Sequence, residues 1–223
     1  DGTTLLTSPA WTIRTSAASS TERVVVHSSS SLQWLSVMDV KTADATGTSL
    51  VDYTYVYQAA PSGDGDVSTQ VSSSHARTPT TDPRDLAGLL LRFSSDTDFL
   101  ILQSYYDGVN SVVEVNNSGT LTGTTATITG NANNILLRWN KTGTSYQAKY
   151  CASDLTDCTV SANWTNLGTA ITKSGVWDRM GLTAYVEWVT GTNTQYGASF
   201  EWFDWAPVGG APPDDATQSL LFW

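Results

Sequence analysis

The sequence predicts an all-β fold, a two-sheet antiparallel sandwich of the jelly-roll type. Charged residues make up only 14% of the 223 residues, while Thr, Val, Tyr and Trp, which suit a pleated and half-buried surface better than a helix, are abundant. Short segments of alternating apolar and polar residues recur along the chain with turn signals between them, which is the pattern of a sandwich or barrel. A chain of this length is normal for a single large β-sandwich and can bury a full core.

The alternation predicts ten strands. In chain order they cover residues 23–27, 32–38, 50–59, 87–93, 98–105, 111–115, 134–140, 145–151, 180–188 and 196–205. Asp107-Gly108 lies between two of these segments and indicates a hairpin turn, and residues 141–144 join another pair. Residues 61–85, a polar stretch with Gly and Pro, are expected to form a long loop, and the last two segments are expected to pair around residues 189–195.

The C-terminal end differs in composition from the rest of the chain. We expect residues 1–207 to form one β-sandwich domain, followed within residues 208–223 by a linker of Gly, Pro and Asp and an apolar tail. The tail ends in the apolar residues Leu220, Leu221, Phe222 and Trp223. Because four large apolar side chains in water would expose a self-associating patch, we expect the tail to pack against protein, with another copy of this chain as the favoured partner.

The charge of the chain excludes some classes of partner. The net charge is −10 and the Lys and Arg residues are scattered, whereas binding to nucleic acid needs a basic patch and docking on anionic lipid needs a basic cluster. No apolar run approaches the ~18 to 20 residues that a membrane span requires. We therefore expect neither a nucleic-acid partner nor a membrane span.

The two cysteines favour an oxidising compartment. Cys151 and Cys158 lie close together in a polar stretch, which favours a disulfide at the tip of a hairpin; two buried free thiols are the alternative. A disulfide indicates an extracellular, secreted or cell-surface location. Asn116, Asn140 and Asn163 each begin an Asn-x-Ser/Thr triplet, so they are candidate glycosylation sites on such a protein.

Several segments together resemble the concanavalin A-like jelly-roll domains found as appendages of secreted glycosidases and in other extracellular proteins. The resemblance covers about residues 50–206 and rests on the order and spacing of Val51–Tyr57, Ala87–Arg92, Asp98–Leu102, Leu136–Trp139 with Tyr146 and Trp164, Gly181–Leu182 and Phe200–Phe203. Glu201 stands where the family often has Asp. The resemblance implies a two-sheet antiparallel sandwich with an accessory role, commonly glycan binding, and no particular ligand.

We expect no catalytic activity. Hydrolases on jelly-roll folds need two carboxylates in one cleft, and the chain has only four Glu. If the last two predicted strands pair with Trp188 opposite Tyr196, Glu187 and Glu201 lie about 13 Å apart at ~3.3 Å per residue, beyond the roughly 5 to 9.5 Å of glycosidase pairs. A register shifted by two residues is the alternative that would close this gap. His27 and His75 lie in Ser-rich surroundings without a Gly-x-Ser-x-Gly motif, and they cannot build a zinc site with two bonded cysteines. No cofactor is expected to be required.

Calcium is the one metal ion that remains a candidate. Asp64 and Asp66 in a Gly-Asp-Gly-Asp run supply the hard oxygen ligands that calcium prefers. Glu201 and Asp204 join them by resemblance to related domains that hold a structural ion. The alternative is that all four are solvated surface acids.

Aromatic side chains are the best candidates for ligand binding. Tyr53, Tyr55 and Tyr57 alternate, so they share one face of a strand, and Trp188 is a candidate for the same face. Sugars present C–H faces that pack on aromatic rings. The alternative is that these rings are core residues, because one face of each strand in a sandwich is buried.

Two functions follow from these observations. The first is a non-catalytic module that binds a polysaccharide or other glycan, or that mediates adhesion. The second is a structural subunit of an extracellular filament or surface polymer, assembled through the apolar tail. Head-to-tail contacts of this kind do not close, so they build a filament.

Overall fold

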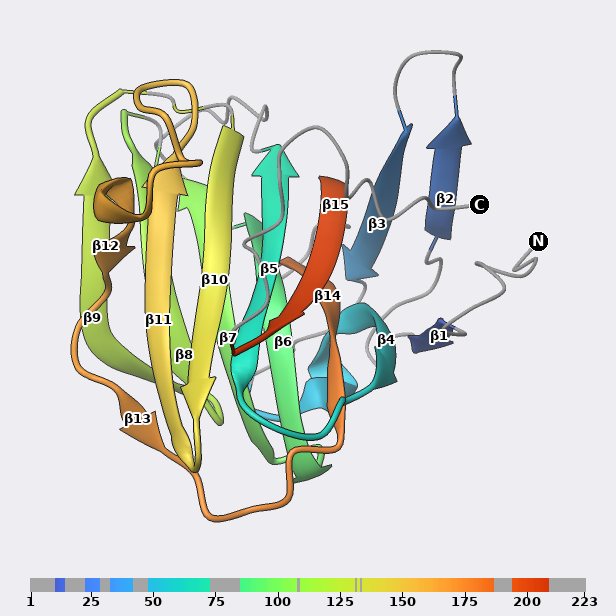
Figure 1. The fold of residues 1–223 in the computed structure, drawn as a ribbon. Coiled ribbons are helices and arrows are strands. Elements are labelled where there is room, and N and C mark those ends of the chain that lie inside the picture. Colours follow the sequence, from blue (N-terminus) through green and yellow to red (C-terminus); the bar gives the residue numbers. More distant parts are fainter. Residues whose placement is uncertain are drawn as a thin grey trace.

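The computed structural model describes residues 11–14, 23–28, 33–41, 48–72, 85–107, 109–130, 132, 134–186 and 194–208. These residues form two antiparallel β-sheets that stack as a sandwich (Figure 1), which confirms the predicted fold class. They also contain two short 3-10 helices, η1 (Leu50–Asp52) and η2 (Ser161–Asn163). None of the helices in the described residues is long and apolar enough to cross a membrane.

The two sheets contain seven and eight strands. The seven-stranded sheet consists, in spatial order, of β1 (Thr12–Arg14), β4 (Thr54–Ala59), β14 (Arg179–Val186), β6 (Asp85–Ser95), β7 (Asp98–Tyr106), β8 (Ser111–Asn117) and β9 (Thr120–Ile128). The eight-stranded sheet consists of β12 (Thr165–Asn166), β11 (Ser145–Ala152), β10 (Asn134–Thr142), β5 (Gly65–Ser72), β15 (Thr194–Pro207), β3 (Gln33–Lys41) and β2 (Arg23–Ser28), with β13 (Ile171–Thr172) also paired to β11.

The main hydrophobic core lies between the two sheets. Every second residue of a strand faces it, as shown by Ile135, Leu137 and Trp139 of β10, which are all fully buried. The Trp139 indole Nε1 donates a 3.1 Å hydrogen bond to the backbone oxygen of Leu89 in β6. One side chain therefore connects the eight-stranded sheet to the seven-stranded sheet.

A second buried cluster covers part of the outer face of the seven-stranded sheet. Its members are Leu50, Tyr53, Tyr55, Leu86, Leu90, Phe99, Ile101 and Tyr185. The η1 turn contributes Leu50, whose backbone N–H donates a 2.8 Å hydrogen bond to the backbone oxygen of Asp96. Because both faces of this sheet bury apolar residues, β6 carries the consecutive buried residues Leu89, Leu90 and Leu91.

The structure agrees with both turn predictions. β7 and β8 are antiparallel neighbours, and the Asp107 N–H donates a 3.0 Å hydrogen bond to the Asn110 oxygen across their turn. β10 and β11 form the other hairpin, in which Gly143 adopts a φ of +58°. That left-handed backbone conformation favours glycine over residues with a Cβ atom.

Two predictions about the strand arrangement are wrong. Residues 61–85 are not one long loop, because they contain β5, a central strand of the eight-stranded sheet. Val67, Thr69 and Val71 of β5 are buried, while the polar residues between them occupy the outer face and make the segment resemble a loop. The last two predicted strands do not pair, since β14 belongs to the seven-stranded sheet and β15 to the eight-stranded sheet.

Candidate functional site

The aromatic face predicted on β4 is mostly core. Tyr53 and Tyr55 are 1% and 0% exposed, so the prediction that these two rings stack on a sugar is wrong. The alternation did place the three tyrosines on one face, but that face is covered at Tyr53 and Tyr55. Tyr57 is partly exposed, and the guanidinium carbon of Arg179 lies 4.4 Å from its ring centroid. Trp188 lies outside the described residues.

One of the three predicted glycosylation sites is closed in the folded chain. Asn116 is 5% exposed, and its Nδ2, the atom that would carry a glycan, donates a 2.9 Å hydrogen bond to the Tyr53 hydroxyl. Burial therefore contradicts the prediction at Asn116. Asn140 and Asn163 are partly exposed, and their glycosylation stays a prediction.

The four predicted calcium ligands do not form a cation site. Asp64 Oδ1 accepts a 2.8 Å hydrogen bond from Lys141 Nζ, while Asp66 lies on β5 and Glu201 and Asp204 lie on β15. In the part of the chain that the structure describes, no group of three or more His, Cys, Asp or Glu side chains is close enough to hold a metal ion. At Asp64, an ion pair with Lys141 therefore replaces the expected calcium site.

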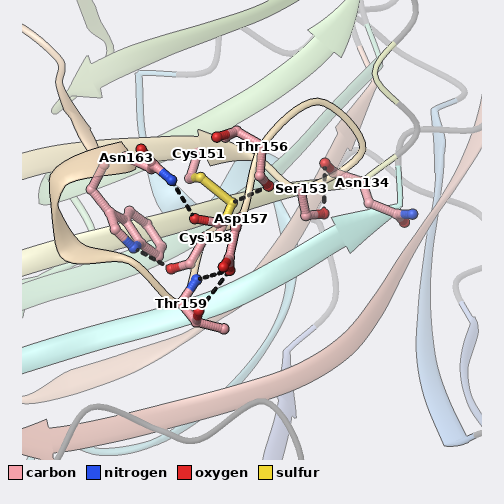
Figure 2. Close-up of a disulfide and its surroundings, with 9 residues drawn as sticks. Asn134, Cys151, Ser153, Thr156, Asp157, Cys158, Thr159 and Asn163 are labelled. Carbon is pink, nitrogen blue, oxygen red and sulfur yellow. Dashed lines mark hydrogen bonds between the residues drawn. A yellow bond between two sulfur atoms is a disulfide. The ribbon is translucent and has the colours of Figure 1, made fainter.

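The predicted disulfide joins Cys151 and Cys158, with their Cα atoms 5.9 Å apart, and it closes a short loop after β11 (Figure 2). Within the loop, Asp157 Oδ1 accepts hydrogen bonds from the backbone N–H and the hydroxyl of Thr159, at 3.0 and 2.6 Å. The Trp164 Nε1 donates a 2.8 Å hydrogen bond to the backbone oxygen of Cys158. The disulfide loop therefore provides one hydrogen bond that helps to position the Trp164 ring.

Trp164 packs over Arg138 on the outer face of the eight-stranded sheet. Arg138 follows the buried Leu137 in β10, so its side chain points away from the core. Its guanidinium carbon lies 3.7 Å from the Trp164 ring centroid, a cation–π contact, and its Nη1 lies 3.5 Å from Asp66 Oδ2. Burial lowers the pKa of Arg138, and the charges of Asp66 and Asp204 act in the opposite direction.

A row of polar residues crosses the same face. Arg138 in β10, Ser68 in β5 and Asp204 in β15 are cross-strand partners. Ser68 and Asp204 are 1% and 6% exposed, and burial raises the pKa of Asp204. Arg138 Nε, Ser68 Oγ and Asp204 Oδ2 are buried without a hydrogen-bond partner among the described residues. Such groups are uncommon in folded proteins, which makes this row the most unusual polar feature of the described sheet.

More accessible donors and acceptors flank the row. Asn140 Nδ2 donates a 2.6 Å hydrogen bond to Asp66 Oδ1, and Gln70 Nε2 donates a 2.7 Å hydrogen bond to Glu201 Oε2. Desolvation by surrounding groups, followed by the charge of Asp154, raises the pKa of Glu201. Amides and carboxylates therefore pair with one another on the same outer face of the sheet as Arg138, on which Trp164 packs.

These residues form one surface, which we call the Trp164 face. It consists of Trp164, Arg138, Asp66, Gln70, Asn140 and Glu201, around the buried Ser68 and Asp204. It combines a partly exposed aromatic ring with both donors and acceptors, which is the chemistry that a hydroxyl-rich ligand requires. Sequence reasoning missed this face, because no local pattern indicates that Trp164 folds back over Arg138.

Solved structures with a similar fold include proteins from yeast and from bacteria. A functionally unknown protein from Saccharomyces cerevisiae aligns with a TM-score of 0.55 at 13% identity, covering 86% of this chain and 97% of that chain. A GH43 protein from Bacillus licheniformis aligns with a TM-score of 0.53 at 12% identity, covering 80% of this chain and 33% of that chain. A xylan beta-1,4-xylosidase from Bacillus halodurans C-125 aligns with a TM-score of 0.50 at 12% identity, covering 75% and 32%.

These likenesses show the fold alone. The two-sheet antiparallel sandwich fits the concanavalin A-like fold, in agreement with the resemblance found in the sequence. This chain spans about a third of the length of the two bacterial chains. No family model and no curated protein matches the sequence.

Proposed function

We propose that this chain is a non-catalytic carbohydrate-binding module of a secreted or cell-surface protein. The observation that carries the proposal is the Trp164 face, where one aromatic ring shares the outer face of a sheet with carboxylates and amides. The concanavalin A-like fold supports it as a scaffold. The disulfide between Cys151 and Cys158 supports a location in an oxidising compartment.

In this proposal the ring and the polar groups have separate roles. A sugar packs its C–H face against the exposed part of the Trp164 ring, and its hydroxyls bond to Asp66, Asn140 and Glu201. Arg138 supports the ring from the sheet side, so the ring is held in place before the ligand arrives. A preorganised site of this kind loses less conformational entropy when it binds.

The two glutamates that the structure describes, Glu114 and Glu201, lie too far apart to act as a catalytic pair with each other. Glu114 is 2% exposed on the outer face of the seven-stranded sheet, where its Oε1 accepts a 2.7 Å hydrogen bond from Gln103. Glu201 lies in the other sheet. Since stacked sheets are about 10 Å apart, two carboxylates on opposite outer faces cannot form a glycosidase pair, which spans roughly 5 to 9.5 Å. Glu22 and Glu187 lie outside the described residues.

Replacing Trp164 with alanine is expected to weaken glycan binding about tenfold or more. The reason is the loss of the stacking surface, taking the ~1 to 3 kcal/mol of base stacking on aromatics as the analogue. The measurement is affinity electrophoresis against a panel of soluble polysaccharides, followed by isothermal titration with the polysaccharide that binds best. Trp164→Phe should retain part of the affinity.

Thr127→Ala is the matched surface control, because Thr127 is exposed on β9 of the other sheet. It should bind as the unchanged protein does. Equal affinity of Trp164→Ala and the unchanged protein would remove the Trp164 face from the proposal. Sugars released from any polysaccharide by the purified protein would contradict the non-catalytic assignment.

A second candidate function is that of a structural subunit in an extracellular polymer. It rests on the four apolar residues at positions 220–223, which lie outside the described residues. Val208, the last described residue, is 69% exposed. The chain therefore leaves the described sandwich at its surface, where a following segment can reach a neighbouring molecule.

Deleting residues 216–223 is expected to abolish assembly and leave a folded monomer, because the deletion removes all the large apolar side chains of the tail. The measurement is sedimentation velocity of the intact and truncated proteins over a range of concentrations. A truncated protein that assembles as before, or an intact protein that stays monomeric at high concentration, would exclude the polymer function and leave the carbohydrate-binding module.

A further inference from the structure

Five charged side chains form a continuous series of ion pairs along the outer face of the seven-stranded sheet. Arg14 Nη1 lies 2.7 Å from Asp96 Oδ2, and Arg92 Nε lies 2.8 Å from Asp96 Oδ1. Arg92 also pairs with Asp178 through Nη1, and Asp178 Oδ2 lies 3.9 Å from Arg179 Nε. Three guanidinium groups and two carboxylates leave a local charge of +1 (3 − 2), with an arginine at each end of the series.

The two end arginines are the accessible ones. The side chains of Arg14 and Arg179 are 34% and 27% exposed, whereas that of the central Arg92 is 11% exposed. Arg92 contacts both aspartates, so it is the guanidinium that the carboxylates neutralise most completely. The unbalanced positive charge therefore lies at the exposed ends.

Both ends of the series meet the tyrosines of β4. Arg14 Nη1 donates a 3.5 Å hydrogen bond to the Tyr55 hydroxyl, and the Arg179 guanidinium lies 4.4 Å from the Tyr57 ring centroid. The centroids of Tyr55 and Tyr57 are 5.5 Å apart. Burial raises the pKa of Tyr55, the charges of Arg14 and Arg179 act in the opposite direction, and the charge of Asp96 acts in the same direction as burial.

Arg179 and Tyr57 have hydrogen-bond donors without a partner among the described residues. Arg179 uses Nε toward Asp178, and no described residue accepts a hydrogen bond from its Nη1 or Nη2. The Tyr57 hydroxyl likewise has no partner among the described residues. The two Nη donors of a guanidinium form a planar fork that matches a carboxylate, and the Tyr57 hydroxyl can supply another donor beside it.

We propose that Arg179, Tyr57 and Arg14 form a binding site for the carboxylate of a uronic-acid residue in an acidic polysaccharide. The Arg179 fork holds the carboxylate, Arg14 adds a second positive charge, and the Tyr57 ring and hydroxyl contact the sugar. This site extends the proposed function, since it names a second class of glycan, and it uses the sheet opposite the Trp164 face.

The net negative charge of the whole chain restricts the binding of an acidic polysaccharide to the local cationic surface around Arg179. A protein with a net charge of −10 repels an anionic polymer in general, so attachment must come from local hydrogen bonds and a local cationic surface. Salt should weaken this binding, because the ligand and the arginines carry opposite charges at an exposed site.

The test is isothermal titration of the full chain with trigalacturonic acid and, separately, with its fully methyl-esterified form. We expect the acid to bind and the ester to bind at least about tenfold more weakly, because esterification removes the charge that the fork recognises. Arg179→Gln should weaken binding of the acid about tenfold or more, and Tyr57→Phe should cause a smaller loss. Lys149→Gln, which removes one positive charge from β11 of the other sheet, should leave binding unchanged.

The outcomes separate this site from the Trp164 face. Loss of acid binding in Trp164→Ala but not in Arg179→Gln would overturn the present proposal and leave the proposed function in place. Equal binding of acid and ester, or no binding of either, would also overturn it. A sulfated trisaccharide that binds more tightly than the uronate, with the same loss in Arg179→Gln, would reassign the site to sulfate and contradict the uronic-acid assignment.

Discussion

Replacing Trp139 with alanine is expected to destabilise the protein by about 3 to 5 kcal/mol, the usual cost of truncating a buried aromatic residue. The Trp139 ring is fully buried between the sheets, and the substitution also removes the hydrogen bond from its Nε1 to the Leu89 oxygen. That backbone oxygen would then stay buried without this donor, which adds to the cost. The measurement is equilibrium unfolding in guanidinium chloride.

Two further variants show whether packing or the hydrogen bond dominates. Trp139→Phe keeps an aromatic ring but no donor, so it should lie between the unchanged protein and Trp139→Ala. Leu155→Ala truncates an apolar side chain that is 65% exposed, and it should change the free energy of unfolding by less than about 0.5 kcal/mol. A Trp139→Ala protein as stable as Leu155→Ala would refute the central role of this residue.

Removing the disulfide is expected to destabilise the protein by about 2 to 3 kcal/mol. The double variant Cys151→Ser/Cys158→Ser frees a short loop, and the chain-entropy model gives about 2.5 kcal/mol for a loop of this size. Because Trp164 bonds to the Cys158 backbone oxygen, the freed loop should also hold Trp164 less firmly over Arg138. Glycan affinity should therefore fall together with stability.

Unfolding in guanidinium chloride, with and without a reducing agent, gives the comparison. The reduced unchanged protein should match the double variant in its midpoint, and the reducing agent should not affect the double variant. If the variant and the oxidised protein unfold at the same midpoint, the disulfide contributes nothing to stability. If stability falls but glycan affinity does not, the loop does not position Trp164.

The sequence contained enough information for most strands, and particular residues show where it was insufficient. The predicted segments 98–105 and 134–140 correspond closely to β7 and β10, because their buried residues are large and apolar. β9 was missed, since Thr120–Ile128 carries five Thr and one Gly, and its three apolar residues do not form a continuous alternation. Alternation also cannot show whether a sheet face is covered, which is why it predicts ligand binding at Tyr53 and Tyr55 although both are buried.

The candidate sites depend on contacts that are distant in sequence. Trp164 contacts Arg138 from beyond the disulfide loop, and Arg14 contacts Asp96 from β1, which pairs with β4. Neither contact has a periodic pattern. The alternation predicts only that the Arg138 side chain in β10 points outward. It does not predict which residue contacts the guanidinium group.

The short strands beside β11 restrict how copies of this chain can join by strand pairing. β12 pairs with Lys149 and Tyr150, and β13 pairs with Ser145 and Tyr146. Between them, the Leu167 N–H donates a 2.8 Å hydrogen bond to the Ala148 oxygen. The chain thus covers its own sheet edge at β11, a common protection against edge-to-edge aggregation. Among the described strands, β1, β2 and β9 end the sheets elsewhere, and a strand donated by another molecule would add there, or beside the two-residue strands β12 and β13, rather than at β11 itself.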